Sequence, residues 1–243
     1  MKIKGADYEI NLTVMPKPNA VIIEGFPGLG FVSTITTSYL IEHLKAKCIG
    51  SLFTKKLAPL AAIHQQKLIQ PIEIFYDEKN NIVIFQSAIT VEKIEYDIAE
   101  IILEFAKKIK ASKIITIEGV ISTKPTEKVY FYATNKEFEK KLLEQGLEKI
   151  NEGIIVGVTG ALLLKAEEFP LIGLFVEIHS ELPDNRASAK IIEVLDKYLG
   201  LNVDYRPLLK KAEEIEKKIK GLIEKVLAAR QEKEKKIAVP YTG

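Results

Sequence analysis

The chain has 243 residues, of which 47% are hydrophobic and 28% are charged. These proportions are ordinary for a well-packed globular protein and exclude a chain that is disordered throughout. The 35 basic residues nearly balance the 33 acidic ones, and the two kinds are interleaved along the sequence. Arginine is rare among the basic residues, so neither the arginine forks nor the clustered positive charge of a nucleic-acid-binding surface is present.

Cysteine content and the apolar runs restrict the compartment and the metal chemistry. Cys48 is the only cysteine, so no internal disulfide and no cysteine-based metal site can form. The segment that begins at Met1 lacks the apolar core of a signal peptide, and the longest apolar runs are too short to span a membrane. We therefore expect a cytoplasmic protein without a bound metal or cofactor. Abundant lysine, glutamate and isoleucine, without tryptophan, favour a thermophilic source.

Short apolar or alternating runs predict the strands of the first half of the chain. They cover residues 8–14, 20–24, 47–53, 72–76, 82–85 and 113–117. The polar segment 77–81 joins two of these strands and predicts a hairpin. Residues 31–44 follow a glycine-rich turn and are predicted to be helical. The apolar residues of 96–109 repeat with the period of a helix.

The second half continues the alternation of strands and helices. Strands are predicted at 129–133, 154–158 and 171–178. Asn135 is placed to cap a helix that stops at Gly146. Asp184 or Asn185 is placed to cap a second helix, which Gly200 ends. The alternation predicts an α/β fold with a mostly parallel sheet and helices on both faces, to which the hairpin adds an antiparallel part.

The sequence changes character after Pro207. Apolar residues then recur at alternating spacings of four and three, the heptad pattern of an amphipathic helix. They are Leu208, Ala212, Ile215, Ile219, Leu222, Val226 and Ala229. Further apolar residues widen this stripe beyond the need of a two-stranded coil, so it packs either on the protein's own core or against more than one partner helix. We divide the chain into an α/β domain (1–206), a C-terminal amphipathic helix (207–236) and a flexible docking tail (237–243).

The tail has the composition of a docking segment. Residues 231–236 are all polar, so a helix there has nothing to pack against and should be solvated. Beyond this spacer stand a rigid proline, an aromatic anchor and a carboxylate, which short docking segments combine. The predicted partner-binding residues are Val239, Pro240, Tyr241, Thr242 and Gly243. A frayed terminus without a partner is the alternative.

The segment Gly25–Gly30 follows a predicted strand and opens a helix, where backbone N–H groups can cradle an anion. Its glycine spacing is neither the dinucleotide fingerprint nor a phosphate-binding P-loop, and Pro27 removes one N–H donor. A tight strand-to-helix turn with close backbone packing is the simpler interpretation. The alternative is a crevice used by a small-molecule-binding protein or a hydrolase.

Candidate catalytic residues are few. His43, His64 and His179 fall in unrelated segments, and no serine-hydrolase or metalloprotease motif accompanies them. His179 is the best candidate for a general base, because acidic residues flank it, although capping or interface contacts are more common for such residues. Cys48 is expected to pack rather than react. We therefore assign no catalytic, cofactor-binding or metal-binding residue.

Two acidic residues stand out by their position. Glu24 and Glu118 each end a buried predicted strand directly before a glycine. Open α/β sheets bind ligands at the carboxyl ends of their strands. If the two strands are neighbours, the two carboxyl groups form a pair at that edge.

Several segments together resemble the archaeal family that is homologous to proteasome-assembly chaperones. The ordered set, rather than any single segment, carries the resemblance over roughly residues 18 to 220. The segments are Glu24–Gly30 (EGFPGLG), Ile114–Gly119 (IITIEG), Gly157–Leu164 (GVTGALLL), Leu182–Ala187 (LPDNRA), Val203–Asp204 and Leu208–Glu216 (LLKKAEEIE).

The resemblance implies a three-layer α/β fold similar to phosphorylase/hydrolase-type domains, homo-oligomers and no catalytic residues. It also implies binding of proteasome α subunits through a C-terminal hydrophobic-Tyr-any motif with a penultimate tyrosine. Here Tyr241 is third from the end and Pro240 takes the hydrophobic position. Gly243 displaces the carboxylate by about 3.5 Å in an extended chain, so docking to the proteasome and docking to another protein both stay open.

These observations favour a non-catalytic, oligomeric scaffold or assembly-chaperone-like protein that presents several tails, as a ring or a bundle. Display of several tails makes a weak single tail useful through effective concentration. A hydrolase or a small-molecule-binding regulator that uses the crevice at Gly25–Gly30 is the alternative.

Overall fold

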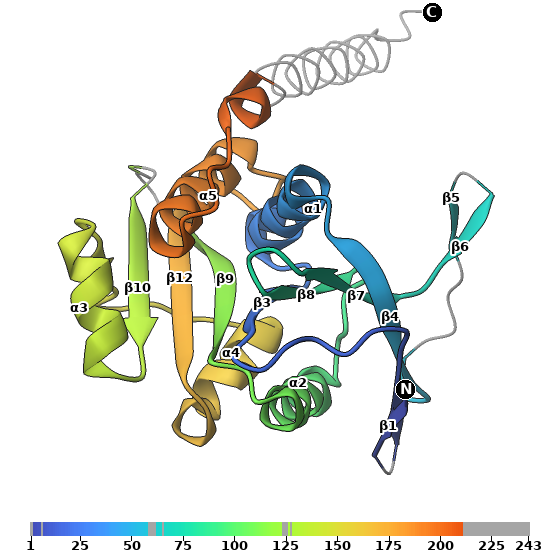
Figure 1. Ribbon diagram of the computed structural model, residues 1–243. Helices are drawn as coiled ribbons and strands as arrows, with labels where there is room; N and C mark the ends of the chain where they lie inside the picture. The colour runs from blue at the N-terminus through green and yellow to red at the C-terminus, as the bar shows by residue number, and fades with distance from the viewer. Residues whose placement is uncertain are drawn as a thin grey trace, which may run out of the picture.

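A ten-stranded mixed sheet runs through the protein, with helices on both of its faces (Figure 1). The computed structural model describes residues 2–5, 7–57, 62–64, 66–122, 126 and 128–210. The strand order is β1-β2-β4-β7-β8-β3-β9-β12-β10-β11, and β5 and β6 form a separate two-stranded sheet.

The strands and helices have the following bounds. The strands are β1 (Lys2–Lys4), β2 (Tyr8–Leu12), β3 (Val21–Gly25), β4 (Lys47–Thr54), β5 (Ala62–His64), β6 (Lys67–Ile69), β7 (Ile72–Asp77), β8 (Ile82–Ser87), β9 (Lys113–Ile121), β10 (Val129–Ala133), β11 (Glu148–Lys149) and β12 (Leu171–Ile178). The helices are α1 (Val32–Leu44), α2 (Glu95–Ile109), α3 (Lys136–Glu144), α4 (Gly157–Leu164) and α5 (Asn185–Leu199), with short 3₁₀ turns η1 (Leu29–Phe31) and η2 (Ala166–Glu168).

The middle of the sheet is parallel and its flanks are largely antiparallel. β8, β3, β9 and β12 pair in parallel, and β7 and β8 form the predicted antiparallel hairpin. Parallel strands need crossover connections, which the helices provide on both faces. The predicted α/β class is confirmed.

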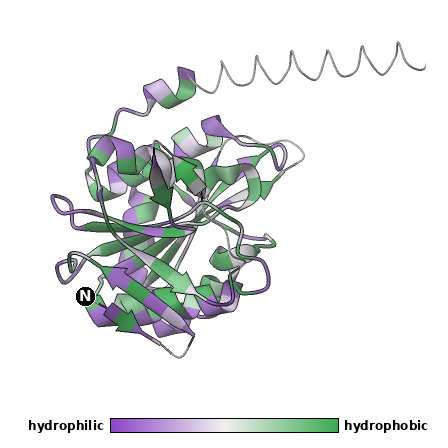
Figure 2. Ribbon diagram, turned by 90° about the vertical axis from the view of Figure 1, so that its right-hand side faces the viewer, coloured by the Kyte–Doolittle hydropathy of each residue, from purple (hydrophilic) through white to green (hydrophobic). Residues whose placement is uncertain are grey.

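Two hydrophobic layers hold the helices against the sheet. One contains buried residues of α2 and α4 and the inward side chains of one sheet face. The other contains buried residues of α1 and α5 and the opposite sheet face. Figure 2 shows the hydrophobic strands between the two helical layers, which carry hydrophilic residues on their outer sides. Because β9 and β12 are covered on both faces, nearly all of their residues are buried.

The predicted helix boundaries are confirmed by their caps. The side chain of Asn135 accepts a hydrogen bond from the backbone N–H of Phe138 (2.9 Å). Asp184, rather than Asn185, caps α5, because its carboxylate accepts from the N–H of Ala187 (2.9 Å). Each of these bonds satisfies an N–H group that the first helical turn leaves without a partner.

The predicted strand at 154–158 is wrong. Ile154 is 86% exposed, and the backbone turns at Gly157 (φ 70°) into helix α4. The β-branched run has the composition of a strand, but burial of Thr159 and Gly160 in a helix decides the local structure. Tertiary packing here overrides β propensity.

Three other features differ from the sequence prediction. β9 continues four residues past its predicted end at residue 117, because its whole length pairs with β12. The short strands β1, β5, β6 and β11 have two or three residues each, too few for a periodic pattern. Cys48 is exposed rather than packed. A register shift between Cys48 and Gly50 interrupts the alternation of β4, so that Lys47 and Cys48 are both exposed.

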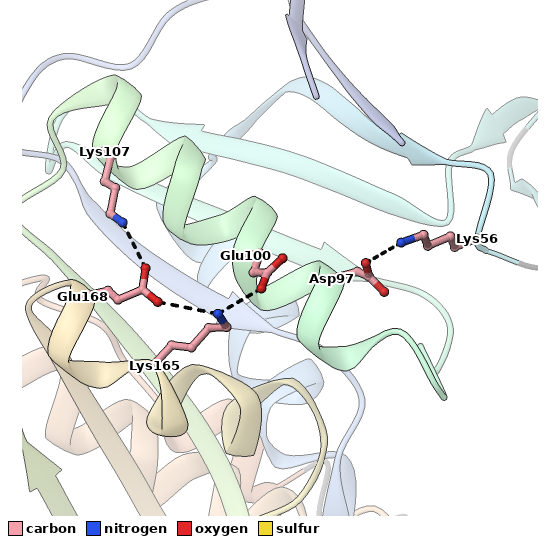
Figure 3. A network of polar contacts seen from close by, with 6 residues as sticks. All are labelled: Lys56, Asp97, Glu100, Lys107, Lys165 and Glu168. Carbon is pink, nitrogen blue, oxygen red and sulfur yellow. Dashed lines mark hydrogen bonds and ion pairs between the residues drawn. The ribbon is translucent and has the colours of Figure 1, made fainter. Parts of the chain in front are cut away.

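Ion pairs tie α2 to the end of α4 (Figure 3). Lys165, which follows α4, contacts Glu100 on α2 (2.9 Å) and Glu168 (3.6 Å). Lys107 on α2 also contacts Glu168, at 3.1 Å. Solvent screens exposed pairs of this kind, so each contributes little to stability.

The structure describes only the first residues of the segment that is predicted to form the C-terminal helix. Residues 206–210 are helical, and Leu208 is buried against the α1–α5 layer. Residues 211–243, including the predicted docking tail, lie outside the described residues. Within the described residues, no helix has the length and apolar character needed to cross a membrane.

Candidate functional site

Glu24 and Glu118 come together at the carboxyl edge of the parallel strands. β3 pairs with β9 only as far as Ile23 opposite Ile115, whereas β9 continues along β12 to Ile121. Side chains alternate between the two faces of a strand. Glu24 therefore lies on the same sheet face as Ile22, and Glu118 lies on the same face as Ile114. Helices α2 and α4 cover this face. The predicted acid pair is present.

Backbone N–H groups hold both carboxyl groups. Glu24 accepts a hydrogen bond from the N–H of Phe26 (2.8 Å). Glu118 accepts from the N–H of Leu29 (2.7 Å) and from that of Gly119 (3.3 Å). The side chains thus fasten the turn after β3 to two neighbouring strands.

Thr159 of α4 joins the two acids. Its hydroxyl lies 3.1 Å from Oε2 of Glu24 as a donor, and it also contacts the carboxyl group of Glu118. A hydroxyl donates one hydrogen bond and can accept another. A protonated Glu118 can therefore donate to Thr159, which donates to Glu24. We call Glu24, Glu118, Thr159 and the turn 25–30 the acid junction.

Burial favours the protonated forms of the pair. Glu24 and Glu118 are only 1% and 4% exposed. Burial raises the pKa of Glu24 to about 7, opposed by the bonds from Phe26 and Thr159. Burial and then the nearby charge of Glu24 raise the pKa of Glu118 to about 8. Two carboxyl groups that share a dry site cannot both ionise without a large penalty, so the pair holds a proton near neutral pH.

The segment Gly25–Gly30 packs around the protein's own side chains. A Cβ atom at Gly28 would overlap the carboxyl group of Glu118, and one at Gly119 would overlap the carbonyl oxygen of Leu29. The N–H of Leu29, a candidate donor for a bound anion, already serves Glu118. Gly30 takes a left-handed conformation (φ 65°) inside η1. The tight-turn interpretation holds, and the carboxyl group of Glu118 takes the N–H donor that a bound anion would need.

The other candidate residues do not join this site. His43 lies in the last turn of α1 and stacks on Tyr39, with ring centroids 6.1 Å apart. His179 follows β12 and is exposed, and His64 belongs to β5. Among the residues that the structure describes, no group of three metal-binding side chains gathers.

Sequence reasoning missed Thr159. The signal was its polar side chain inside the apolar segment Gly157–Leu164, behind a glycine that can turn the chain. Predicting a strand at 154–158 hid this signal. Gly160 also approaches the carbonyl group of Ile155 too closely to carry a Cβ atom without a shift, so this segment packs as closely as the turn after β3.

Four of the six segments that carry the family resemblance meet at the acid junction. Glu24–Gly30, Ile114–Gly119 and Gly157–Leu164 contribute the two acids, the turn and Thr159. The segment Leu182–Ala187 joins them, because the N–H of Asp184 donates to the carbonyl oxygen of Gly30 (2.9 Å). Residues distant in the sequence thus form one buried connection.

The fold and the junction define an α/β protein whose central polar groups bind its own segments together. The profile of the PAC2 family matches residues 22–223 of the chain. The chain therefore belongs to the PAC2 family. The PAC2 match and the similarity to an archaeal homologue of proteasome-assembly chaperone together confirm the resemblance that the sequence predicted.

Two proteins that are similar in sequence come from an archaeon. Two uncharacterized proteins of Methanocaldococcus jannaschii are similar along most of their length. One is 33% identical over 211 residues, covering 86% of this chain and 87% of the relative. The other is 30% identical over 233 residues, covering 90% of each.

Two solved structures of Pyrococcus furiosus share the fold. PbaA, an archaeal homologue of proteasome-assembly chaperone, has a TM-score of 0.80 and 32% identity, with 96% of this chain and 99% of PbaA covered. PbaB, an archaeal proteasome activator, has a TM-score of 0.77 and 22% identity, with 89% and 98% covered. The likeness to PbaB shows the fold alone, whereas the similarity to PbaA also supports a chaperone-like role.

Proposed function

We propose that this protein is a non-catalytic, homo-oligomeric assembly chaperone that docks partner proteins through residues 237–243. The observation that carries the proposal is the similarity to PbaA, which extends over 96% of this chain. In this view the α/β domain is the scaffold and the tails of several copies act together. Proteasome α subunits are the first partner to test.

The acid junction supports a non-catalytic role. Its two carboxyl groups are buried, and their hydrogen bonds go to the protein's own backbone and to Thr159. A catalytic acid or base must reach the proton that it transfers. At Gly25–Gly30 these hydrogen bonds thus connect parts of the protein's own chain, where the alternative interpretation expected a crevice for a small molecule.

The order of residues at the end of the tail sets what it can bind. Tyr241 stands one place further from the end than in the hydrophobic-Tyr-any motif of the resembling family. The carboxylate is then shifted by about 3.5 Å, too far for the direct ion pair that a penultimate tyrosine permits. Display of several tails raises the effective concentration and compensates for a weak single contact.

The test uses purified proteasome α subunits and four forms of the protein, namely the unaltered chain and three variants of its tail. We expect the unaltered protein to bind them weakly and removal of residues 237–243 to abolish binding. Removal of Gly243 alone should strengthen binding, because Tyr241 becomes penultimate. Tyr241→Ala removes the aromatic anchor alone and leaves the length of the tail unchanged.

If the form without residues 237–243 still binds as well as the intact chain, the docking role of the tail is refuted. If removal of Gly243 leaves α-subunit binding undetectable, the proteasome is not the partner. A pull-down from an archaeal extract, compared between the same forms, then tests for other partners.

A further inference from the structure

One face of α1 borders an open apolar groove. Residues of the turn before α1 and of the helix line a cavity of about 320 Å³. These residues are Phe31, Thr34, Ile35, Ser38, Tyr39 and Glu42. Pro183 and Leu208 also line the cavity. We call this surface the α1 groove.

The α1 groove has the shape that a helix needs. Its six lining residues from the α1 segment follow one another at spacings of three, one, three, one and three, so they form a single face of a helix. At about 1.5 Å per residue this face is about 16 Å long. Such a row of side chains accepts the ridge of a second helix, and an amphipathic helix in an apolar groove is a recurrent mode of recognition.

Phe31 gives the groove an anchor. Its backbone is left-handed (φ 50°, ψ 24°), a conformation that is unfavourable for a residue with a Cβ atom. The residue is nevertheless 42% exposed. Strain that keeps a large apolar side chain at the surface is typical of binding sites.

The same chain carries a stripe that fits this groove. The heptad pattern begins at Leu208, which is 5% exposed and lies at the edge of the α1 groove. Six further apolar residues continue the pattern to Ala229. As a helix, residues 208–229 would extend about 33 Å, twice the length of the groove.

We infer that the α1 groove of one copy is covered by the stripe 208–229 of a second copy. This inference specifies the oligomer of the proposed function and rests on it. Figures 1 and 2 show the turn 206–210 on the outer side of the α1–α5 layer. Residues 209–220 contain neither glycine nor proline, so the sequence predicts no reversal near the groove. The stripe of a second copy can reach the groove without such a reversal.

The experiment is disulfide trapping between two differently tagged full-length copies, expressed together in a Cys48→Ser background. One copy carries Ser38→Cys or Thr34→Cys in the groove. The other carries Ile215→Cys, Ile219→Cys or Leu222→Cys in the stripe. Leu143→Cys on α3 is 46% exposed and replaces the groove cysteine as the matched control. Circular dichroism confirms that each variant is folded.

We expect a covalent product that contains both tags, at twice the 27.3 kDa of one chain, with a groove cysteine and not with Leu143→Cys. Two results overturn the inference. One is a disulfide that forms only when the groove cysteine and the stripe cysteine are on the same chain, which would mean that the stripe covers the groove of its own copy. The other is no product at any of the three stripe positions. Because no proteasome is present, either result is separate from a failure of tail docking.

Discussion

The acid junction and the α1 groove lie at the two sides of the same turn and are built in opposite ways. The junction is polar and closed: Glu24 and Glu118 are 1% and 4% exposed, and glycines allow the backbone to approach them. The groove is largely apolar and open, with Phe31 42% exposed at one end. Residues 25–30 face the first region, and Phe31 turns the chain toward the second.

This difference separates what holds the domain together from what can bind another molecule. Four of the six segments that carry the family resemblance meet at the closed region, where the carboxyl groups of Glu24 and Glu118 are buried. Closed polar networks stabilise one arrangement of a core when all their members have partners. Apolar side chains that stay at the surface mark an interaction site.

The largest expected effect is on the pH dependence of stability. In the unfolded chain a glutamate has its ordinary pKa, near 4.5, whereas in the folded protein that of Glu118 is about 8. Between these values the folded state holds more protons, so the free energy of unfolding falls as pH rises and levels off above about 8. Each pKa unit corresponds to about 1.4 kcal/mol, so Glu118→Gln should remove a loss of about 4 kcal/mol between pH 5 and pH 9.

Guanidinium unfolding at a series of pH values, followed by circular dichroism, measures this effect. Gln still accepts the bond from Leu29 but does not ionise, so the variant isolates the charge. Glu137→Gln, at an exposed helical position, is the control and should leave the curve above pH 5 unchanged. A wild-type curve that is flat from pH 5 to pH 9 would contradict a buried, protonated pair.

The second prediction concerns packing at the acid junction. Gly28→Ala places a Cβ atom where the carboxyl group of Glu118 lies. We expect the free energy of unfolding to fall by about 2–3 kcal/mol, the usual cost of overpacking a core. Gly153→Ala is the control, because its Cβ atom would meet only the end of the Ile150 side chain.

A double variant tests the cause of that loss. Glu118→Ala removes the group that Gly28→Ala would strike, so the two changes together should cost less than the sum of their separate effects. Strict additivity of the two losses would show that Gly28 is required for another reason.

The smallest expected effect has the opposite sign and lies at the α1 groove. Phe31→Asn should raise the free energy of unfolding or leave it unchanged, within about 1 kcal/mol, because asparagine tolerates the left-handed backbone. The same change should reduce the disulfide product between Ser38→Cys and Ile219→Cys. A clear loss of stability together with an unchanged product would mean that Phe31 packs within its own domain and does not contact a second copy.

The regular elements were predictable because their residues alternate or repeat over long stretches. The helices α2 and α5 have strong helical periods and end in left-handed residues, and β12 has the predicted bounds. The short strands carry too few residues for a pattern. Residues 154–158 were misassigned because a β-branched run was the local signal, whereas burial of Thr159 in α4 was not visible in one dimension.

The acid pair was predictable in part. A glutamate before a glycine at the end of a buried strand indicates a polar group at the edge of a sheet, and this holds for Glu24 and Glu118. Their closeness required that β3 and β9 be neighbours, which sequence order alone does not decide. Thr159, from a third segment, could not be added before α4 was placed.

The sequence by itself determined the α/β class and most helices and strands. These depend on the spacing of residues along the chain, which can be interpreted without knowledge of the fold. The tertiary structure decided that Gly25–Gly30 encloses the carboxyl group of Glu118 and that Phe31 faces outward beside it. Both depend on which distant segments share a strand edge or a helix face, since burial and neighbouring charge arise only when the chain is folded.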